Sequence, residues 1–187
     1  LAYAKRKALE MNIDNLEFLQ ADILELEELD ERFDIVECGG VLHHMEKPMD
    51  GWRVLTNLLK PQGYMYIALY SETARKPVIE ARRYIQEKGY QANLNDIRQC
   101  RQDLFNLPQE HPASYLNFGA DFYTTSSIRD LIFHTQEHRF TIPQIKECID
   151  ELGLELLGMY TMNRALQNKF VQTYPNGKWM TFHFIMH

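Results

Sequence analysis

The stretch "FDIVECGGVLHHMEKP" (residues 33–48) holds the end of one predicted element, a polar loop and the start of the next. Its first five or six residues predict a strand, which is broken by Gly39 and Gly40. Pro48 is typical of the first turn of a helix. The nearly all-apolar run "YMYIALY" (64–70) then predicts a second strand buried on both faces, as in parallel sheets. The stretch therefore predicts a strand–helix–strand unit.

The alternation of helix and strand extends along the chain in both directions. A helical pattern occupies residues 1–11, and "LEFLQ" (16–20) predicts a strand after it. Thr141 and Gln144 have the spacing of a capping box at a helix start, and "LELLGMY" (154–160) predicts the next strand. This order favours an α/β fold with a Rossmann-like, doubly wound, mostly parallel sheet.

The sheet pattern is interrupted in the middle of the chain. Amphipathic helices are predicted over residues 76–89 and 94–108, and a third over residues 126–134, with Ser126 or Ser127 as its cap. This segment is far longer than an ordinary connection between two elements.

The interruption divides the chain into three predicted parts. Residues 1–71 form a partial α/β core that holds the cofactor, and residues 72–140 form a helical insertion or lid. Residues 141–187 return to the α/β core, with a helix over residues 163–174 and an ambiguous last strand over residues 177–187.

Composition argues against several classes of partner. The 187 residues carry a net charge of -6, so a general basic field that would attract nucleic acid or anionic lipid is missing. No apolar run approaches the roughly 20 residues that cross a bilayer. Three widely spaced cysteines fit a reducing cytosol better than a disulfide framework, which predicts a cytoplasmic protein. A local basic patch is indicated by Arg75, Lys76, Arg82 and Arg83.

Two pairs of histidines raise the question of a metal. His43 and His44 are adjacent, so on an extended backbone their side chains point to opposite faces. His134 and His138 would share a helix face with Glu137 between them, which resembles half of an HExxH arrangement with the glutamate misplaced. We expect no metal here and interpret His134 and His138 as polar residues of a lid helix. A metal-dependent hydrolase that uses them is the last-ranked alternative.

Two predicted strand ends carry residues suited to a ligand. In an open α/β sheet, ligands bind beyond the carboxyl ends of the strands. Gly39 lies at such an end, where a glycine lets a ligand approach the backbone. Asp22 follows the strand predicted at residues 16–20 and is placed to accept a hydrogen bond from an adenine amine, with Ile23 packing on the ring. The alternatives are a turn aspartate and a core isoleucine.

Three segments in order resemble the later half of a class I S-adenosylmethionine-dependent methyltransferase. They are "FLQADI" (18–23), the opening stretch at residues 33–48, and "LLKPQGYMYIALYS" (58–71). The resemblance covers about residues 1–70 and 141–160. The segment "DFYTTSSIRDLIFHTQEHRFTIPQI" (121–145) further resembles a bacterial subgroup often found behind tetratricopeptide repeats. The resemblance implies methyl transfer with S-adenosylmethionine as the cofactor.

The resemblance also implies which residues hold the cofactor. Asp22 and Ile23 would bind the adenine. The backbone of Cys38 and Gly39 would face the methionine part, and Val41 would support it.

The residues of the acceptor site are less well defined than those of the cofactor site. His43 or His44 would act as the base or orient the acceptor, and the alternative is a hydrogen bond to the loop backbone. Arg129, His134 and Glu137 would line the acceptor site from the insertion. The acceptor is a small molecule or a protein, and the sequence does not name it.

The glycine-rich GxGxG loop and the acidic ribose-binding residue of this family would lie upstream of Leu1. We therefore expect the natural protein to extend N-terminally, or a second chain to complete the sheet, because a bare strand edge is unfavourable. A catalytically inactive, methyltransferase-like interaction module is the alternative function.

Overall fold

The structure is a computed structural model that describes residues 1–134, 136–159, 168–169 and 172. The elements are, in chain order, α1 (Ala2–Glu10), the 3-10 helix η1 (Ile23–Glu28), β1 (Phe33–Gly39), η2 (Leu42–His44), α2 (Pro48–Asn57), β2 (Leu59–Ala68), α3 (Lys76–Lys88), α4 (Leu94–Phe105), η3 (Pro112–Phe118), η4 (Ala120–Phe122), α5 (Thr125–Phe133) and α6 (Ile142–Glu151). The helix predicted at 163–174 lies largely, and the strand predicted at 177–187 entirely, outside the described residues. No described helix is long and apolar enough to span a membrane.

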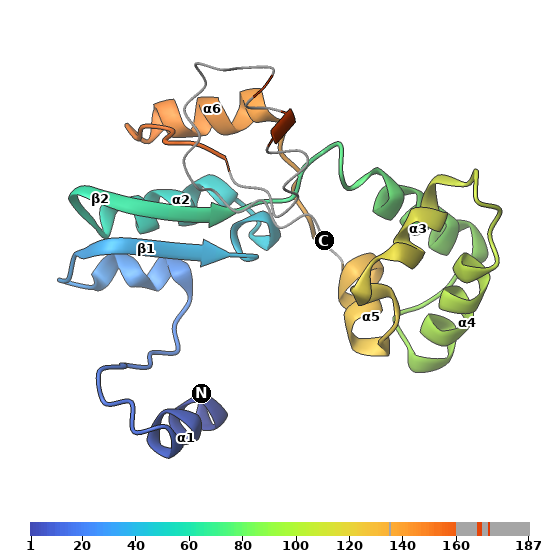
Figure 1. The fold of residues 1–187 in the computed structure, drawn as a ribbon, viewed down its shortest axis with the longest axis horizontal. Helices are drawn as coiled ribbons and strands as arrows, with labels where there is room; N and C mark the ends of the chain where they lie inside the picture. Colours follow the sequence, from blue (N-terminus) through green and yellow to red (C-terminus); the bar gives the residue numbers. More distant parts are fainter. Residues whose placement is uncertain (135, 160–167, 170–171, 173–187) are drawn as a thin grey trace.

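β1 and β2 form a parallel pair, connected through α2 (Figure 1). Gly39 aligns with Ala68, so both strands end at the same edge of the sheet. Trp52 of α2 packs in one hydrophobic cluster with Val36 of β1 and Ile67 of β2. The parallel pair confirms the fold class expected from the strand–helix–strand pattern.

The second strand begins earlier than predicted. β2 starts at Leu59, ahead of the strand predicted at residues 64–70, and ends at Ala68. The register of the β1–β2 pair shifts within this added part, where Gln62 has a φ of 65°. A Cβ at Gly63 would stand 2.9 Å from the carbonyl oxygen of Lys60, so the chain can pass this closely only where a side chain is missing.

Two predicted strands are wrong. Residues 16–20 form no strand, and Leu16 and Leu19 are exposed. Residues 154–159 of the strand predicted at residues 154–160 form none either. A strand is defined by hydrogen bonds to a neighbour, and no described strand pairs with the outer edge of β1 or of β2. The residue pattern of both segments is typical of strands. A local pattern does not, however, provide the neighbouring strand with which a segment must form hydrogen bonds.

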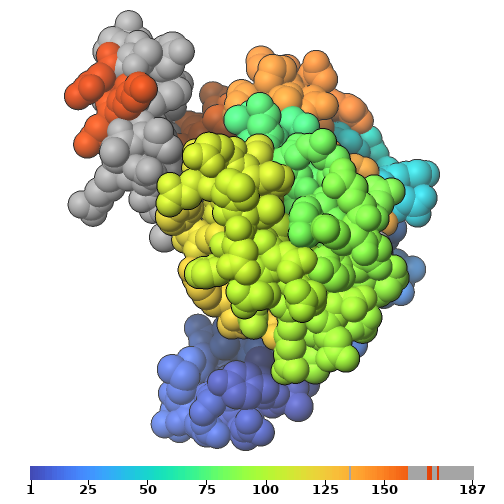
Figure 2. Space-filling model, turned by 90° about the vertical axis from the view of Figure 1, so that its right-hand side faces the viewer, coloured from blue at the N-terminus to red at the C-terminus, as the bar shows by residue number. Residues whose placement is uncertain are grey.

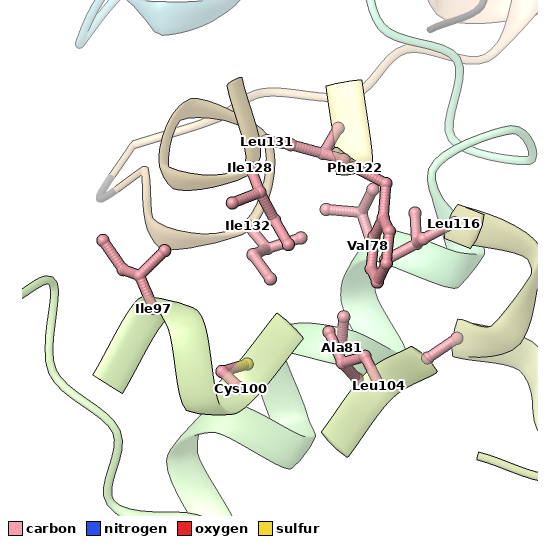
Figure 3. Packing of buried hydrophobic residues seen from close by; sticks show 11 residues of the cluster. Val78, Ala81, Ile97, Cys100, Leu104, Leu116, Phe122, Ile128, Leu131 and Ile132 are labelled. Carbon is pink, nitrogen blue, oxygen red and sulfur yellow. The ribbon is translucent and has the colours of Figure 1, made fainter. Parts of the chain in front are cut away.

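α3, α4 and α5, with η3 and η4 between α4 and α5, form a helical group beyond the carboxyl ends of the two strands (Figure 1), and this group fills the centre of the face seen in Figure 2. Its buried residues make one hydrophobic cluster (Figure 3): Val78, Ala81, Ile97, Cys100, Leu104, Ala113, Leu116, Phe122, Ile128, Leu131 and Ile132. A second cluster around the sheet shares none of these residues. The division of the chain at residues 72 and 140 stays a prediction.

The three helices predicted for this segment are confirmed, with one correction at α5. Thr124, rather than Ser126 or Ser127, is its cap, and the Thr124 hydroxyl accepts a hydrogen bond from the backbone N–H of Ser127 at 3.0 Å. The capping box of Thr141 and Gln144 at the start of α6 is confirmed.

The two connections between the sheet and the helical group run side by side. Ser71 and Phe140 form an isolated parallel bridge. The N–H of Phe140 donates to the carbonyl of Tyr70 at 2.8 Å, and the N–H of Glu72 donates to the carbonyl of Phe140 at 3.0 Å. Arg139 adds an ion pair to Glu72 at 3.0 Å. The outgoing and returning segments therefore join just past the end of β2.

Candidate active site

The loop after β1 leaves open space at the strand ends. Cys38 is buried, and burial raises the pKa of its thiol. Gly39 is exposed, and an added Cβ there would meet no atom within 4 Å. Gly40 has a φ of 76°, which turns the chain out of the strand. Val41 is 44% exposed. The backbone of this loop is therefore accessible where ligands bind in open α/β sheets.

Asp22 and Ile23 mark the start of η1. An Asp22 carboxylate oxygen accepts a hydrogen bond from the N–H of Leu24 at 2.9 Å, and Glu25 completes a capping box. Asp22 itself is exposed. Ile23 packs against the hydrophobic cluster that contains Cys38. The structure thus places Ile23 against the same cluster as the predicted methionine-binding loop, with the Asp22 carboxylate beside it at the surface.

Three imidazole rings and one phenol gather around η2. The ring centroid of His43 lies 3.7 Å from that of Tyr70, and the centroid of His44 lies 4.0 Å from that of His134. The ring centroids of His43 and His44 lie 4.4 Å apart. The guanidinium of Arg75 lies 3.9 Å from the Tyr70 ring centroid, within cation–π range. Of the predicted acceptor-site residues, this ring cluster brings together His43, His44 and His134.

His43 is enclosed. It is 1% exposed, and neither ring nitrogen has a hydrogen-bond partner among the described residues. Burial, followed by the nearby His44, lowers the pKa of His43 to about 4. The ring is therefore neutral at neutral pH and is a weak proton acceptor.

His44 is only partly buried, and its orientation is fixed by the backbone. Its Nδ1 lies 2.9 Å from the carbonyl oxygen of Gln136. A carbonyl oxygen can only accept a hydrogen bond, so Nδ1 carries the hydrogen. In the neutral ring the lone pair is then on Nε2, for which no described residue supplies a hydrogen bond. His44 is therefore the ring that is placed to take a proton.

Glu137 is surrounded by arginines. Its side chain is fully buried, and its carboxylate accepts hydrogen bonds from Arg75, through Nε at 3.1 Å and through Nη2, and from Arg82 at 3.0 Å. Nη1 of Arg139 lies 3.9 Å from Oε1 of Glu137. Burial alone would raise the pKa of Glu137, but the hydrogen bonds and charge of Arg75, with the other arginines, hold it below its usual range. In this geometry the Glu137 carboxylate is enclosed by arginines.

A cavity of about 190 Å³ adjoins the ring cluster at Tyr70. Asp121, Ser127, Asp130 and Leu131 complete its lining. Two larger hollows, of about 480 and 350 Å³, lie along β2 and β1 and share no lining residue with the ring cluster.

Arg129, predicted to line the acceptor site, is exposed on α5 and does not line the cavity at Tyr70. The common helix face predicted for His134 and His138 is wrong, because α5 ends at Phe133. Within the described ranges, no three His, Cys, Asp or Glu residues are placed to hold a metal ion.

The sequence did not identify Tyr70 and Arg75 as parts of this site. It also did not indicate that the Arg82 side chain binds the buried carboxylate of Glu137. The basic patch predicted around residues 75–83 is wrong in part: Arg75 is buried, and Arg82 binds Glu137. One signal was available, since Tyr70 ends the predicted strand at the edge where ligands bind. The arginine contacts depend on a glutamate more than 50 residues away and leave no local pattern.

A sequence family described as "Methyltransferase domain" matches residues 1–114 of the chain. The chain belongs to this family. The assignment confirms the resemblance to a methyltransferase that was found in the sequence. It leaves the acceptor of this methyltransferase domain open.

Two solved structures and a curated relative are similar to this chain. The structure of PKMT2 from Rickettsia typhi superimposes with a TM-score of 0.66 at 16% sequence identity, over 91% of this chain and 36% of that one. The same protein in complex with AdoHcy gives a TM-score of 0.65 at 20% identity, over 92% and 36%. These likenesses show the fold.

An uncharacterized protein of Synechococcus sp. is 25% identical over 157 residues, which are 81% of this chain and 38% of that protein. The methyltransferase domain described here therefore spans less than two-fifths of the length of these relatives.

Proposed function

We propose that this domain binds S-adenosylmethionine at the ends of its strands and catalyses methyl transfer to a nitrogen nucleophile. The observation that carries the proposal is the accessible backbone at Gly39, at the carboxyl end of β1, in a chain of the methyltransferase family. Asp22 would bind the adenine amine, Ile23 would pack on the ring, and the backbone of Cys38 and Gly39 would face the methionine part.

S-adenosylmethionine supplies a reactive methyl group and leaves as S-adenosylhomocysteine. The chain therefore has to align the acceptor and remove its proton, and alignment alone supplies much of the acceleration. We assign the proton to Nε2 of His44, because Nδ1 is engaged by Gln136. His43 supports the ring cluster by packing on Tyr70.

The cavity at Tyr70 suits an acceptor that is an amine. Asp121 and Asp130 contribute carboxylates to its lining, and Ser127 contributes a hydroxyl. Such a lining favours a group that donates hydrogen bonds or carries a positive charge. An amine is protonated near neutral pH and must lose a proton before it can attack, which is the task given to His44. A lysine side chain of a protein and a small amine both meet these requirements. A cytoplasmic location stays a prediction.

Replacing Gly39 with alanine should weaken S-adenosylhomocysteine binding about tenfold or more. The new methyl group has free space in the unliganded fold but would enter the space assigned to the cofactor, and overpacking of this kind costs about 1–3 kcal/mol. Calorimetric titration of the full-length protein measures the affinity, and the melting temperature should be unchanged.

Gly119→Ala is the matched control, because it adds the same methyl group in the helical group at an ordinary 3.5 Å contact. Equal affinities of wild type and G39A would contradict the assigned position of the cofactor. A wild-type protein that binds no S-adenosylhomocysteine would favour the inactive interaction module.

A further inference from the structure

The segment that returns from the helical group touches the histidine loop at two neighbouring points. The carbonyl oxygen of Gln136 accepts the hydrogen bond from Nδ1 of His44 at 2.9 Å. The N–H of His138 donates to the carbonyl of His43 at 2.7 Å. Both contacts come from backbone atoms, so their geometry depends on where the chain between residues 136 and 138 is held.

Glu137 lies between these two contacts, and its side chain anchors the segment. Its carboxylate is fully buried, and it binds Arg75 and Arg82. Arg75 is itself buried and also donates to the carbonyl of Leu131 in α5 at 3.3 Å. A carboxylate held by two guanidinium groups has little freedom to move. The backbone at residues 136 and 138 is therefore tied to the helical group through Glu137, in addition to the hydrogen bond that the N–H of Gln136 donates to Nδ1 of His134 at 3.3 Å.

We propose that Glu137 is a positioning residue for the base: by anchoring the returning segment, it holds the Gln136 carbonyl against His44 and keeps the Nε2 lone pair directed at the acceptor. The inference rests on the proposed function, in which His44 takes the acceptor's proton.

The proton balance requires this orientation. In the neutral ring the hydrogen sits on Nδ1, bound to the Gln136 carbonyl, and Nε2 is unprotonated. Nε2 takes a proton from the protonated amine, whose nitrogen lone pair is then free to bond to the methyl carbon as the bond from that carbon to sulfur breaks. The resulting imidazolium has a hydrogen on both nitrogens, and the Gln136 carbonyl still accepts one of them. With the opposite tautomer, the lone pair would point at a carbonyl oxygen and be useless as a base.

The test is the tautomer of His44, read from its ring nitrogen chemical shifts in ¹⁵N NMR spectra of the full-length protein, recorded at a pH where the ring is neutral. Wild type should show a protonated Nδ1 and an unprotonated Nε2. Glu137→Gln, which loses the carboxylate that the arginines bind, should give a mixture of the two tautomers. A His44 in E137Q that keeps the wild-type tautomer would overturn the proposal.

Glu72→Gln is the matched control. It removes a carboxylate from the other connection, where Glu72 pairs with Arg139 at 3.0 Å, and it should leave the tautomer unchanged. If E137Q fails to fold, Arg82→Gln removes one of the two partners at a partly exposed position and should shift the tautomer in the same direction. An unchanged tautomer in R82Q would then reject the proposal.

The measurement needs neither cofactor nor acceptor. A failure of the proposed methyl transfer is therefore distinguishable from a failure of the positioning role.

Discussion

Replacing Arg75 with methionine should lower the free energy of unfolding by about 3–5 kcal/mol, the usual cost of removing one partner from a buried ion pair. Arg75 is 1% exposed and binds the fully buried carboxylate of Glu137. Arg82 and Arg139 stay nearby, but their side chains are 23% and 29% exposed, so they compensate only in part. Chemical denaturation of the full-length protein measures the change.

Arg53→Met is the matched control for this prediction. Arg53 pairs with Glu151 at 2.7 Å, but both side chains are about half exposed. A surface pair contributes roughly 0–1 kcal/mol, so this variant should lose less than about 1 kcal/mol. The double variant R75M/E137L should lose less than the sum of its two single variants, because it removes both charges of the pair. Equal decreases in the free energy of unfolding for R75M and R53M would contradict a stabilising role of the buried ion pair between Arg75 and Glu137.

Replacing His44 with asparagine should lower the rate of methyl transfer about 100-fold or more, because general base catalysis contributes about 10²–10⁴ to a rate. A lysine-containing peptide serves as the amine acceptor, and transfer of a labelled methyl group from S-adenosylmethionine is followed. The affinity for S-adenosylhomocysteine should stay close to that of wild type, since His44 is not assigned to the cofactor.

His111→Asn is the control for the loss of a histidine. His111 caps η3 by accepting a hydrogen bond from the N–H of Ala113 at 3.2 Å, a role that asparagine also fills. Its rate should match that of wild type. If H44N transfers methyl groups as fast as H111N, His44 is not the base. A wild-type protein that methylates no amine would reject the proposed acceptor class.

The parts of the fold that local patterns encode were predictable. Pro48 at the first turn of α2 and the Thr141 capping box each act within a few residues, and each is found where expected. The apolar run at residues 64–70 does contribute to β2, but its predicted burial on both faces is wrong, because Tyr64 is 61% exposed. Strands are different, because they need a partner. "LEFLQ" has a strand pattern, yet residues 16–20 are unpaired in the structure.

In the candidate site, too, some residues were predictable from local sequence patterns and others were not. Gly39 and His44 were predictable because they follow a recognisable strand end. The assignment of the base to His44 rather than His43 was not, because it depends on burial of one ring and on the Gln136 carbonyl, 92 residues further along the chain. Glu137 was predicted to contact the acceptor, and only the folded arrangement of Arg75 and Arg82 shows it enclosed. Contacts between distant segments leave no periodicity to detect.

The most direct measurement is a crystal structure of the full-length protein with S-adenosylhomocysteine. The adenine amine should lie within hydrogen-bond distance of the Asp22 carboxylate, the sulfur should lie against the backbone at Gly39, and Nε2 of His44 should face the space beyond the sulfur. A nucleoside bound away from both Asp22 and Gly39 would contradict this arrangement.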